Sequence, residues 1–269
     1  MIDQGELIEA EPVAKSRTAP RLGPRSTEGR LVYAVGDVHG RYDLLKEMLA
    51  LVARDSAEIA GGRTPMLVML GDYVDRGPDS AKVLQALAWL QRRGEFSLRL
   101  LKGNHEQGLL GFLEDPEQGL DWLAFGGDAT LAAYGVTPPT PSAGADAMVR
   151  ARDALLDAMP ASHLQLLAEL ELMAVVGDYV FAHAGVRPDT PLAAQREQDL
   201  LWIRRGFLDE PGPFERIVVH GHTWLNEEPQ LMGCRIGLDT GAYATGVLTA
   251  ARLDAAAMQI LQVSPSGAL

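Results

Sequence analysis

LVYAVGDVHG, residues 31–40, joins a short apolar run to a polar Gly-Asp-Val-His-Gly motif. The same arrangement recurs in MLVMLGDYVDRG, residues 66–77, and in LRLLKGNHE, residues 98–106. Short apolar runs that end at turn residues are typical of buried strands. The first two motifs are each followed by apolar residues at helical spacing, from Leu44 to Val52 and from Val83 to Leu90. Strands that alternate with helices predict an α/β fold whose sheets are covered by helices.

The remainder of the chain divides into a helical middle and a second half rich in strands. Residues 106–171 are mostly helical in pattern, with a loop around 138–144. Strand patterns follow at Leu172–Ala182, Ile217–Val219, Arg235–Leu238, Val247–Leu253 and Met258–Val263, with helical residues at Gln198–Trp202. Residues 1–29 show no apolar periodicity, which is typical of a flexible tail. We therefore expect a tail at 1–29 and one domain at 30–269.

The acidic composition excludes several classes of protein. The 269 residues carry a formal net charge of -12 at pH 7, which repels the phosphate backbone of nucleic acids. A phosphate substrate is still compatible, because two divalent cations in a site would reverse the local charge. We see no apolar run long enough to span a membrane and no secretory signal, and the single Cys234 allows no intrachain disulfide. We expect a cytoplasmic protein that binds neither nucleic acid nor a membrane.

Five of the six histidines stand in motifs rich in Gly, Asp and Asn, and these motifs follow apolar runs. They are GDVHG (36–40), GDYVDRG (71–77), GNHE (103–106), HAG (183–185) and HGHT (220–223). Imidazole, carboxylate and amide oxygen together form a ligand set for transition metals. Motifs that follow strands can converge at a sheet edge, so the pattern favours a metal site.

Asp72 is the natural centre of such a site, because a carboxylate can bridge two cations held ~3.5–4 Å apart. Asp37 and His39 can reach one cation from a single turn. The second cation would take Asn104, His183 and His222. A water that bridges the two cations would become a nucleophile at neutral pH, which predicts a hydrolase with two metal ions.

Other residues of the same motifs suit proton transfer and phosphate binding. His105 can protonate a leaving oxygen, and Asp75 can bond its second nitrogen and keep it charged. Arg76 offers a fork for phosphate oxygens, and Arg204 is a second candidate. Asn104 is a candidate for phosphate contact as well as for the metal.

These ordered motifs resemble the phosphoprotein phosphatase family of metallophosphoesterases, in particular its bacterial and phage lambda type. The resemblance runs from about Leu31 to about Thr249. It implies a calcineurin-like αββα sandwich of two mixed β-sheets flanked by helices, with two divalent ions, most often Mn, with Fe or Zn as alternatives. It implies the metal ligands Asp37, His39, Asp72, Asn104, His183 and His222. It also implies His105 as general acid with Asp75 as its partner, and Arg76 and Arg204 on the phosphate.

The leading hypothesis is a phosphatase of phosphoserine and phosphothreonine in proteins, with phosphotyrosine as a further candidate. Its partner would be a phosphorylated protein or peptide, and we expect no regulatory subunit. One alternative is a symmetrical diadenosine tetraphosphate hydrolase, a group that resembles this chain but typically has a small residue at Asp75 and GNHD in place of GNHE. Another is a phosphopeptide-binding module without activity. The sequence leaves the native metal and the oligomeric state open.

Three residues near or outside the motifs have structural interpretations. His163 is expected to be a structural histidine at the surface or at a helix start. His220 has no predicted ligand role and is either a core histidine or a group behind the ligands. Trp122 is expected to be a packing residue.

Overall fold

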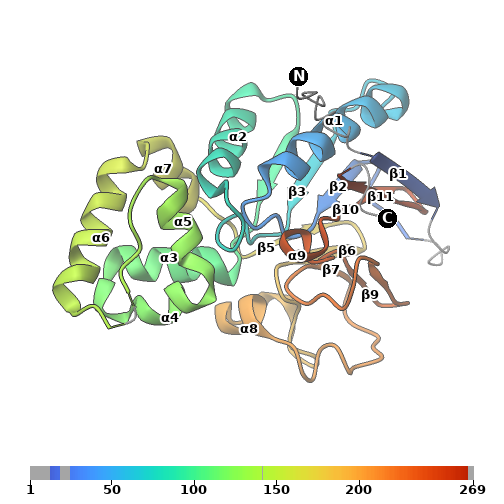
Figure 1. Cartoon of the computed structure of the whole chain (residues 1–269). Helices are drawn as coiled ribbons and strands as arrows, with labels where there is room; N and C mark the ends of the chain where they lie inside the picture. Colours follow the sequence, from blue (N-terminus) through green and yellow to red (C-terminus); the bar gives the residue numbers. More distant parts are fainter. Residues whose placement is uncertain (1–12, 19–24, 141, 266–269) are drawn as a thin grey trace, which may run out of the picture.

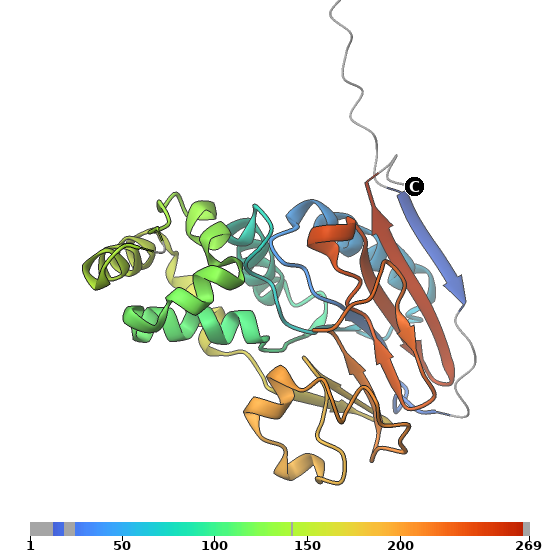
Figure 2. The same cartoon turned by 60° about the horizontal axis from the view of Figure 1, so that its bottom comes forward.

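Two β-sheets stacked face to face form the centre of the protein, and helices cover their outer sides (Figures 1 and 2). The computed structural model describes residues 13–18, 25–140 and 142–265. The arrangement confirms the predicted αββα sandwich of two mixed sheets.

The first sheet has six strands, which are β1 (Val13–Thr18), β2 (Leu31–Val35), β3 (Met66–Met69), β4 (Ser97–Leu100), β10 (Leu248–Asp254) and β11 (Ala257–Ser264). Their order across the sheet is β1-β11-β10-β2-β3-β4. Strands β2, β3 and β4 are parallel to one another, whereas β10 pairs antiparallel with both β2 and β11. The last strands of the domain therefore lie beside the first of its predicted strands.

The second sheet has five strands, which are β5 (Met173–Val176), β6 (Tyr179–Ala182), β7 (Ile217–His220), β8 (Gln230–Leu231) and β9 (Arg235–Gly237). Their order is β5-β6-β7-β9-β8. The strands β6, β7 and β9 are parallel, and each edge adds one antiparallel strand.

Alternate residues of the central strands enter two different layers of the core. In β2, Leu31, Tyr33 and Val35 face the helices, while Val32 and Ala34 pack against the second sheet. All five residues are fully buried, which explains why a central strand reads as an unbroken apolar run. A third cluster covers the outer side of the second sheet, where Phe207 packs with residues of β6 and β7.

Helices surround the sheets on three sides (Figure 2). Helices α1 (Tyr42–Ile59) and α2 (Ser80–Arg93) cover the first sheet, and α8 (Glu197–Trp202) lies on the second. A lobe beside the sheets contains α3 (Asn104–Glu114), η1 (Pro116–Gln118), α4 (Leu120–Trp122), η2 (Leu123–Gly127), α5 (Asp128–Ala133), α6 (Ala145–Ala158) and α7 (Ala161–Ala168). The short η3 (Leu192–Ala194) and α9 (Ala242–Thr245) complete the described helices. None of the helices in the described ranges combines the length and apolarity needed to cross a membrane.

The expectations for the N-terminal segment and for His163 can be compared with the structure. Much of the expected tail at 1–29 lies outside the described residues, but Val13–Thr18 forms β1 along β11, and Thr27 is fully buried. Local apolar pattern gave no sign of β1, because a short edge strand is held by the backbone of its partner strand. His163 does lie in the first turn of α7, but it is buried and not at the surface.

Burial in the central strand β3 allows a test of the core. Leu67 is fully buried against the helices, so Leu67→Ala should lower the free energy of unfolding by about 2–5 kcal/mol. Leu225 is 74% exposed, and Leu225→Ala should change the free energy of unfolding by less than about 0.5 kcal/mol. Urea unfolding followed by circular dichroism measures both. Equal effects of the two substitutions would contradict this placement of the core.

Candidate metal centre

The predicted ligands meet where the parallel strands of both sheets end. Asp37 and His39 follow β2, and Asp72 follows β3. Asn104 is the first residue of α3, the element that follows β4. The second sheet contributes His183 after β6 and His222 after β7. Carboxyl ends of parallel strands are the usual place of sites in α/β folds, and here two sheets share one site.

Three side chains converge on one side of this cluster. The Oδ1 atom of Asn104 lies 2.8 Å from Nε2 of His183 and 2.9 Å from Nδ1 of His222. The other ring nitrogen of His183 donates to the carbonyl of Leu70, 2.9 Å away, which directs Nε2 into the site. An amide oxygen and two imidazole nitrogens so placed form a mixed O/N ligand set.

Asp72 lies between two groups of possible ligands. Its carboxylate is 3.4 Å from Nε2 of His183 and 3.5 Å from Nε2 of His39. Asp72 forms one group with His39 and His105, and another with His183 and His222. A carboxylate common to both groups has the position that a bridging ligand needs.

Asp37 is the remaining predicted ligand. Its Oδ2 accepts a hydrogen bond of 2.9 Å from the backbone N–H of His222, whereas its Oδ1 is buried without a hydrogen-bond partner. A buried carboxylate oxygen without a partner is costly unless a ligand satisfies it. Burial, together with the nearby Asp239 and Asp72, raises the pKa of Asp37.

The charges of the cluster fit divalent cations. Burial lowers the pKa of His39 to about 3 and also lowers that of His183 and His222, so these imidazoles are neutral, as metal ligands must be. Burial opposes ionisation of Asp72, but any positive charge on the surrounding histidines, His183 first, holds its pKa below the ordinary value. The donor set and the crowded buried carboxylates therefore fit the dinuclear centre that the sequence predicts.

The backbone around the cluster is strained, and close packing explains two of its glycines. Left-handed φ angles occur at His39, Asp72 and His222, where side chains other than glycine rarely adopt them. A Cβ atom at Gly103 would lie 2.1 Å from Oδ1 of Asp72, and one at Gly221 would lie 1.9 Å from Oδ1 of Asp37. Strained backbone of this kind is found at functional sites.

His105 and Asp75 form a buried pair beside the cluster. Nδ1 of His105 lies 2.7 Å from Oδ2 of Asp75, which is fully buried. Asp75 also accepts hydrogen bonds from the indole of Trp122 at 2.9 Å and from the hydroxyl of Thr130 at 2.6 Å. Burial opposes the charged form of His105, but Asp72 and Asp75 outweigh it and raise its pKa.

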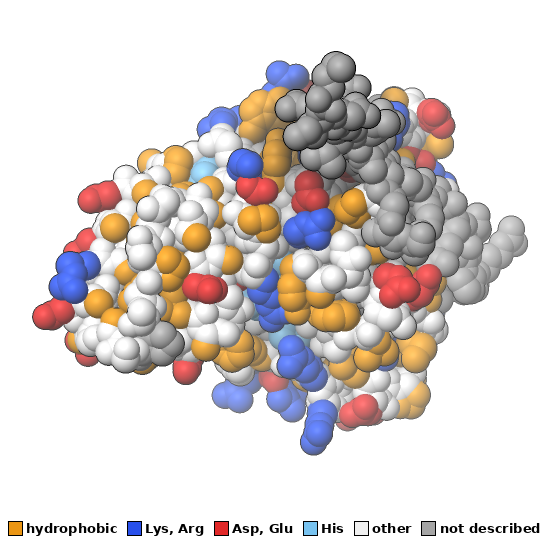
Figure 3. All heavy atoms as spheres, viewed as in Figure 1, with side chains coloured by type: hydrophobic (Ala, Val, Ile, Leu, Met, Phe, Trp, Pro, Cys, Tyr) orange, Lys and Arg blue, Asp and Glu red, His pale blue; other side chains and the backbone are white. Residues whose placement is uncertain are grey.

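Two arginines line the cleft over the cluster. The cleft has a volume of about 300 Å³, and both Arg76 and Arg204 contribute to its wall. Arg76 lies over the ring of Tyr243, with its guanidinium carbon 4.6 Å from the ring centre, and its Nη2 is 3.2 Å from Nε2 of His105. Figure 3 shows histidine atoms between basic side chains near the middle of this face. The structure thus brings every predicted site residue to one place.

Several residues of the site were not predicted from the sequence. Thr130 was not singled out. Trp122 was interpreted as a packing residue and does stack on Phe112, but its indole N–H also donates a hydrogen bond to Asp75, which was not predicted. Tyr243 follows the Asp239-Thr240-Gly241-Ala242 segment, which was the available signal for this wall.

His220 lies in the core, and its Nε2 has no hydrogen-bond partner among the described residues. It is fully buried on β7 and packs edge-on against Phe207. Its Nδ1 is 3.0 Å from the carbonyl of Gly221, and no ligand of the cluster is among its hydrogen-bond partners in the described chain.

Comparison with known proteins identifies similar sequences and folds. The family model described as calcineurin-like phosphoesterase matches residues 31–240. Serine/threonine-protein phosphatase 1 of Salmonella typhimurium is 31% identical over 84% of this chain and 93% of that protein. The asymmetrical bis(5'-nucleosyl)-tetraphosphatase PrpE of Bacillus velezensis is 27% identical over 81% of this chain and 87% of that protein. A solved structure of a candidate diadenosine tetraphosphatase has 21% identity and a TM-score of 0.55, over 89% of this chain and 96% of that one.

The family match covers the strands and motifs that build the buried cluster, and the cluster has the side chains that phosphoester hydrolysis with two metal ions requires. The chain therefore belongs to the calcineurin-like phosphoesterase family and is a hydrolase that acts on phosphoester bonds.

Proposed function

We propose that the enzyme removes phosphate from phosphoserine and phosphothreonine in proteins, with phosphotyrosine as a further substrate. The observation that carries this proposal is the buried pair of His105 and Asp75 at 2.7 Å, next to the metal cluster. A serine or threonine alkoxide is a poor leaving group, so its hydrolysis needs a proton donor held beside the leaving oxygen. The Salmonella relative, which matches most of the chain, is named as such a phosphatase.

The proposed ligands divide between two divalent ions, with Mn the first candidate and Fe or Zn the alternatives. Asp37 and His39 would hold one ion, Asn104, His183 and His222 would hold the other, and Asp72 would be shared by both. When bound, the ions supply positive charge for the phosphate and lower the pKa of water. The second ring nitrogens of His39 and His183 are bonded to the carbonyls of Val74 and Leu70, which fixes the rings.

Arg76 and His105 exchange partners in the proposed reaction. Without substrate, Nη2 of Arg76 donates toward Nε2 of His105, which leaves the proton of that histidine on Nδ1, facing Asp75. A phosphate in the cleft accepts hydrogen bonds from the guanidinium of Arg76 and frees Nε2 of His105 to take a proton from solvent water. Asp75 stabilises the resulting imidazolium, which donates the proton to the leaving oxygen. Arg204, which also lines the cleft, gives the phosphate a second cation.

A dinucleotide tetraphosphate hydrolase is the second candidate, because the Bacillus velezensis relative is named as one. It would use the same cluster, so the metal centre does not distinguish the two. A binding module without activity is disfavoured, since every proposed ligand is present and turned into the cluster.

The bridging role of Asp72 predicts a loss of metal. Asp72→Asn keeps the size of the side chain but removes the charge that balances two cations. We expect the variant to bind at least one metal ion fewer per chain and to lose nearly all activity, with an unchanged circular dichroism spectrum. Asp157→Asn, an exposed acid on α6, is the matched control and should change neither. Two metal ions per chain and full activity in Asp72→Asn would exclude the bridge.

Proton donation by His105 predicts a dependence on the leaving group. His105→Asn should lower kcat for a phosphoserine peptide by about 10²–10⁴-fold. The loss should be smaller for para-nitrophenyl phosphate, whose leaving group needs little protonation. Asp75→Asn combined with His105→Asn should cost little more than His105→Asn alone, because Asp75 acts through the histidine. Equal losses on both substrates would instead assign His105 to substrate positioning.

The choice between the two enzyme activities is tested on the unmodified protein. With added manganese, kcat/KM for a phosphoserine peptide should exceed that for diadenosine tetraphosphate, because Asp75 and the Glu106 of GNHE are of the phosphatase type. Phosphate release and nucleotide products are measured in parallel. A tenfold preference for the dinucleotide would overturn the phosphatase proposal and leave the metal assignment intact.

A further inference from the structure

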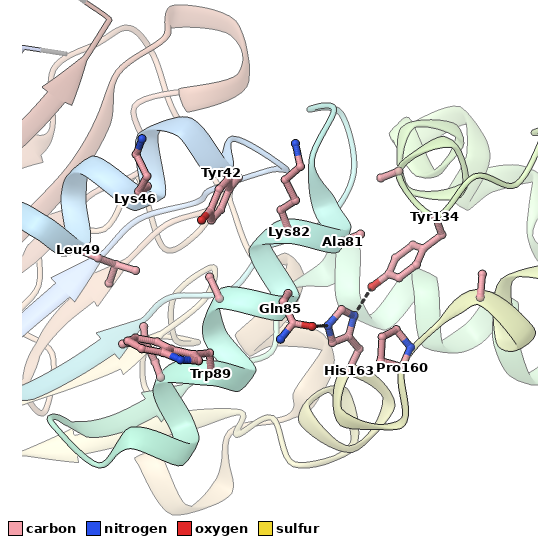
Figure 4. Close-up of a pocket in the computed structure, with 14 residues that line it drawn as sticks. Tyr42, Lys46, Leu49, Ala81, Lys82, Gln85, Trp89, Tyr134, Pro160 and His163 are labelled. Atoms are coloured by element: carbon pink, nitrogen blue, oxygen red, sulfur yellow. Dashed lines mark hydrogen bonds between the residues drawn. The ribbon is translucent and has the colours of Figure 1, made fainter. Parts of the chain in front are cut away.

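A second hollow lies away from the metal centre, on the outer face of α2 (Figure 4). Its volume of about 820 Å³ exceeds that of the cleft over the metal cluster and falls in the usual range of ligand pockets, roughly 300–1,000 Å³. Helix α1 forms one wall, and the opposite wall comes from the end of α5 and the start of α7. We call this hollow the α2 groove.

The floor and the α1 side of the groove are apolar. Leu49 of α1 and Ala86, Trp89 and Leu90 of α2 line it. Trp89 is 47% exposed, which is unusual for the largest apolar side chain. An apolar hollow left open to water commonly marks a binding site.

Polar groups on the α7 side already have partners. His163 bonds the hydroxyl of Tyr134 through Nδ1 at 2.7 Å and Oε1 of Gln85 through Nε2 at 3.3 Å. Figure 4 shows this chain of three side chains at the wall. A bound peptide would bring backbone N–H and C=O groups that need partners, and this wall offers few. A ligand with an aliphatic or aromatic body has no backbone N–H and C=O groups that need partners, so it fits this wall better.

Two lysines stand at the rim of the groove, and each is paired with a neighbouring carboxylate. Lys46 and Lys82 are the charged residues among the described side chains that line the groove. Figure 4 shows both ammonium groups directed to the same side, with Tyr42 between them. They pair with Glu47, at 3.5 Å, and Asp79, at 2.7 Å; the lysine side chains are exposed and the two acids are partly buried, so these pairs near the surface are weak. Another carboxylate can replace these partners at small cost.

We propose that the α2 groove binds a small amphipathic anion with an apolar body and one carboxylate. The carboxylate lies between Lys46 and Lys82, and the apolar body lies along α2 against Leu49 and Trp89. This ligand is separate from the phosphoester substrate, because none of the groove's residues belongs to the metal cluster. The proposal therefore does not depend on which phosphoester the enzyme hydrolyses.

The test uses dodecanoate, below its micellar concentration, as the probe. Calorimetric titration of the whole protein should show one site per chain, and affinity should rise from octanoate to dodecanoate by up to roughly fourfold per methylene. Dodecyltrimethylammonium and dodecanol should bind at least tenfold more weakly. The tryptophan fluorescence should change on binding, and that change should disappear in Trp89→Phe.

Charge reversal supplies the matched comparison. The double variant Lys46→Glu/Lys82→Glu should weaken dodecanoate binding at least tenfold. Arg30→Glu/Arg54→Glu has the same net charge, places the changes on exposed residues away from the groove, and should leave the affinity unchanged. Saturating inorganic phosphate with manganese should not displace dodecanoate.

Three results would overturn the proposal. The cationic amphiphile could bind as well as dodecanoate, which would mean that the rim does not select an anion. Phosphate could displace dodecanoate, which would place binding at the metal centre. Sedimentation could show a dimer that the reversal of Lys46 and Lys82 dissociates, in which case a second copy of the chain occupies the groove.

Discussion

The site depends on one buried carboxylate that is not itself a predicted metal ligand. Glu106, in the first turn of α3, accepts hydrogen bonds from the backbone N–H groups of Asp72, Tyr73, Val74 and Gly103 at 2.7–3.2 Å. It therefore ties the turn after β3 to the turn after β4, and so fixes Asp72 relative to Asn104. Burial and the nearby Asp72 raise the pKa of Glu106 to about 8, while the N–H donors favour its ionised form.

The hydrogen bonds to Glu106 matter because the backbone conformations of the turns that carry the candidate ligands are high in free energy. Asp72, Asp75 and Arg76 all have left-handed φ angles, as do His39 and His222. Each such residue costs on the order of 1 kcal/mol or more. Five together are comparable with the whole net stability of a domain, about 5–15 kcal/mol. The hydrogen bonds to Glu106, and any ion that binds the folded but not the unfolded chain, offset that cost.

The features that could be predicted have a local sequence signal, and the features that could not be predicted depend on contacts between residues far apart in the sequence. Strands β2 and β3 were predictable because full burial makes them unbroken apolar runs beside their motifs. The link of Asp75 to Thr130 was not, since 55 residues separate a hydroxyl from a carboxylate that nothing in the local sequence connects. The sheet order was equally hidden: β10 lies against β2 although more than 200 residues separate them. The candidate ligands could be predicted from the motifs alone, whereas the hydrogen bonds that hold them in place could be seen only in the structure.

The overall charge bears on the choice of substrate. A net charge of -12 opposes the approach of any phosphate, and it opposes a tetraphosphate bridge more than a single phosphomonoester. At physiological ionic strength the Debye length is about 8 Å, so the charges close to the phosphate decide binding. In the cleft these are Arg76 and Arg204 with the proposed ions, which is enough positive charge for one phosphoryl group. Figure 3 shows basic side chains on both sides of the histidine atoms, so the face around the cleft can accept a phosphate ester. The local charge therefore suits either substrate class, and the buried pair of His105 and Asp75 remains the observation that favours a phosphoserine or phosphothreonine ester.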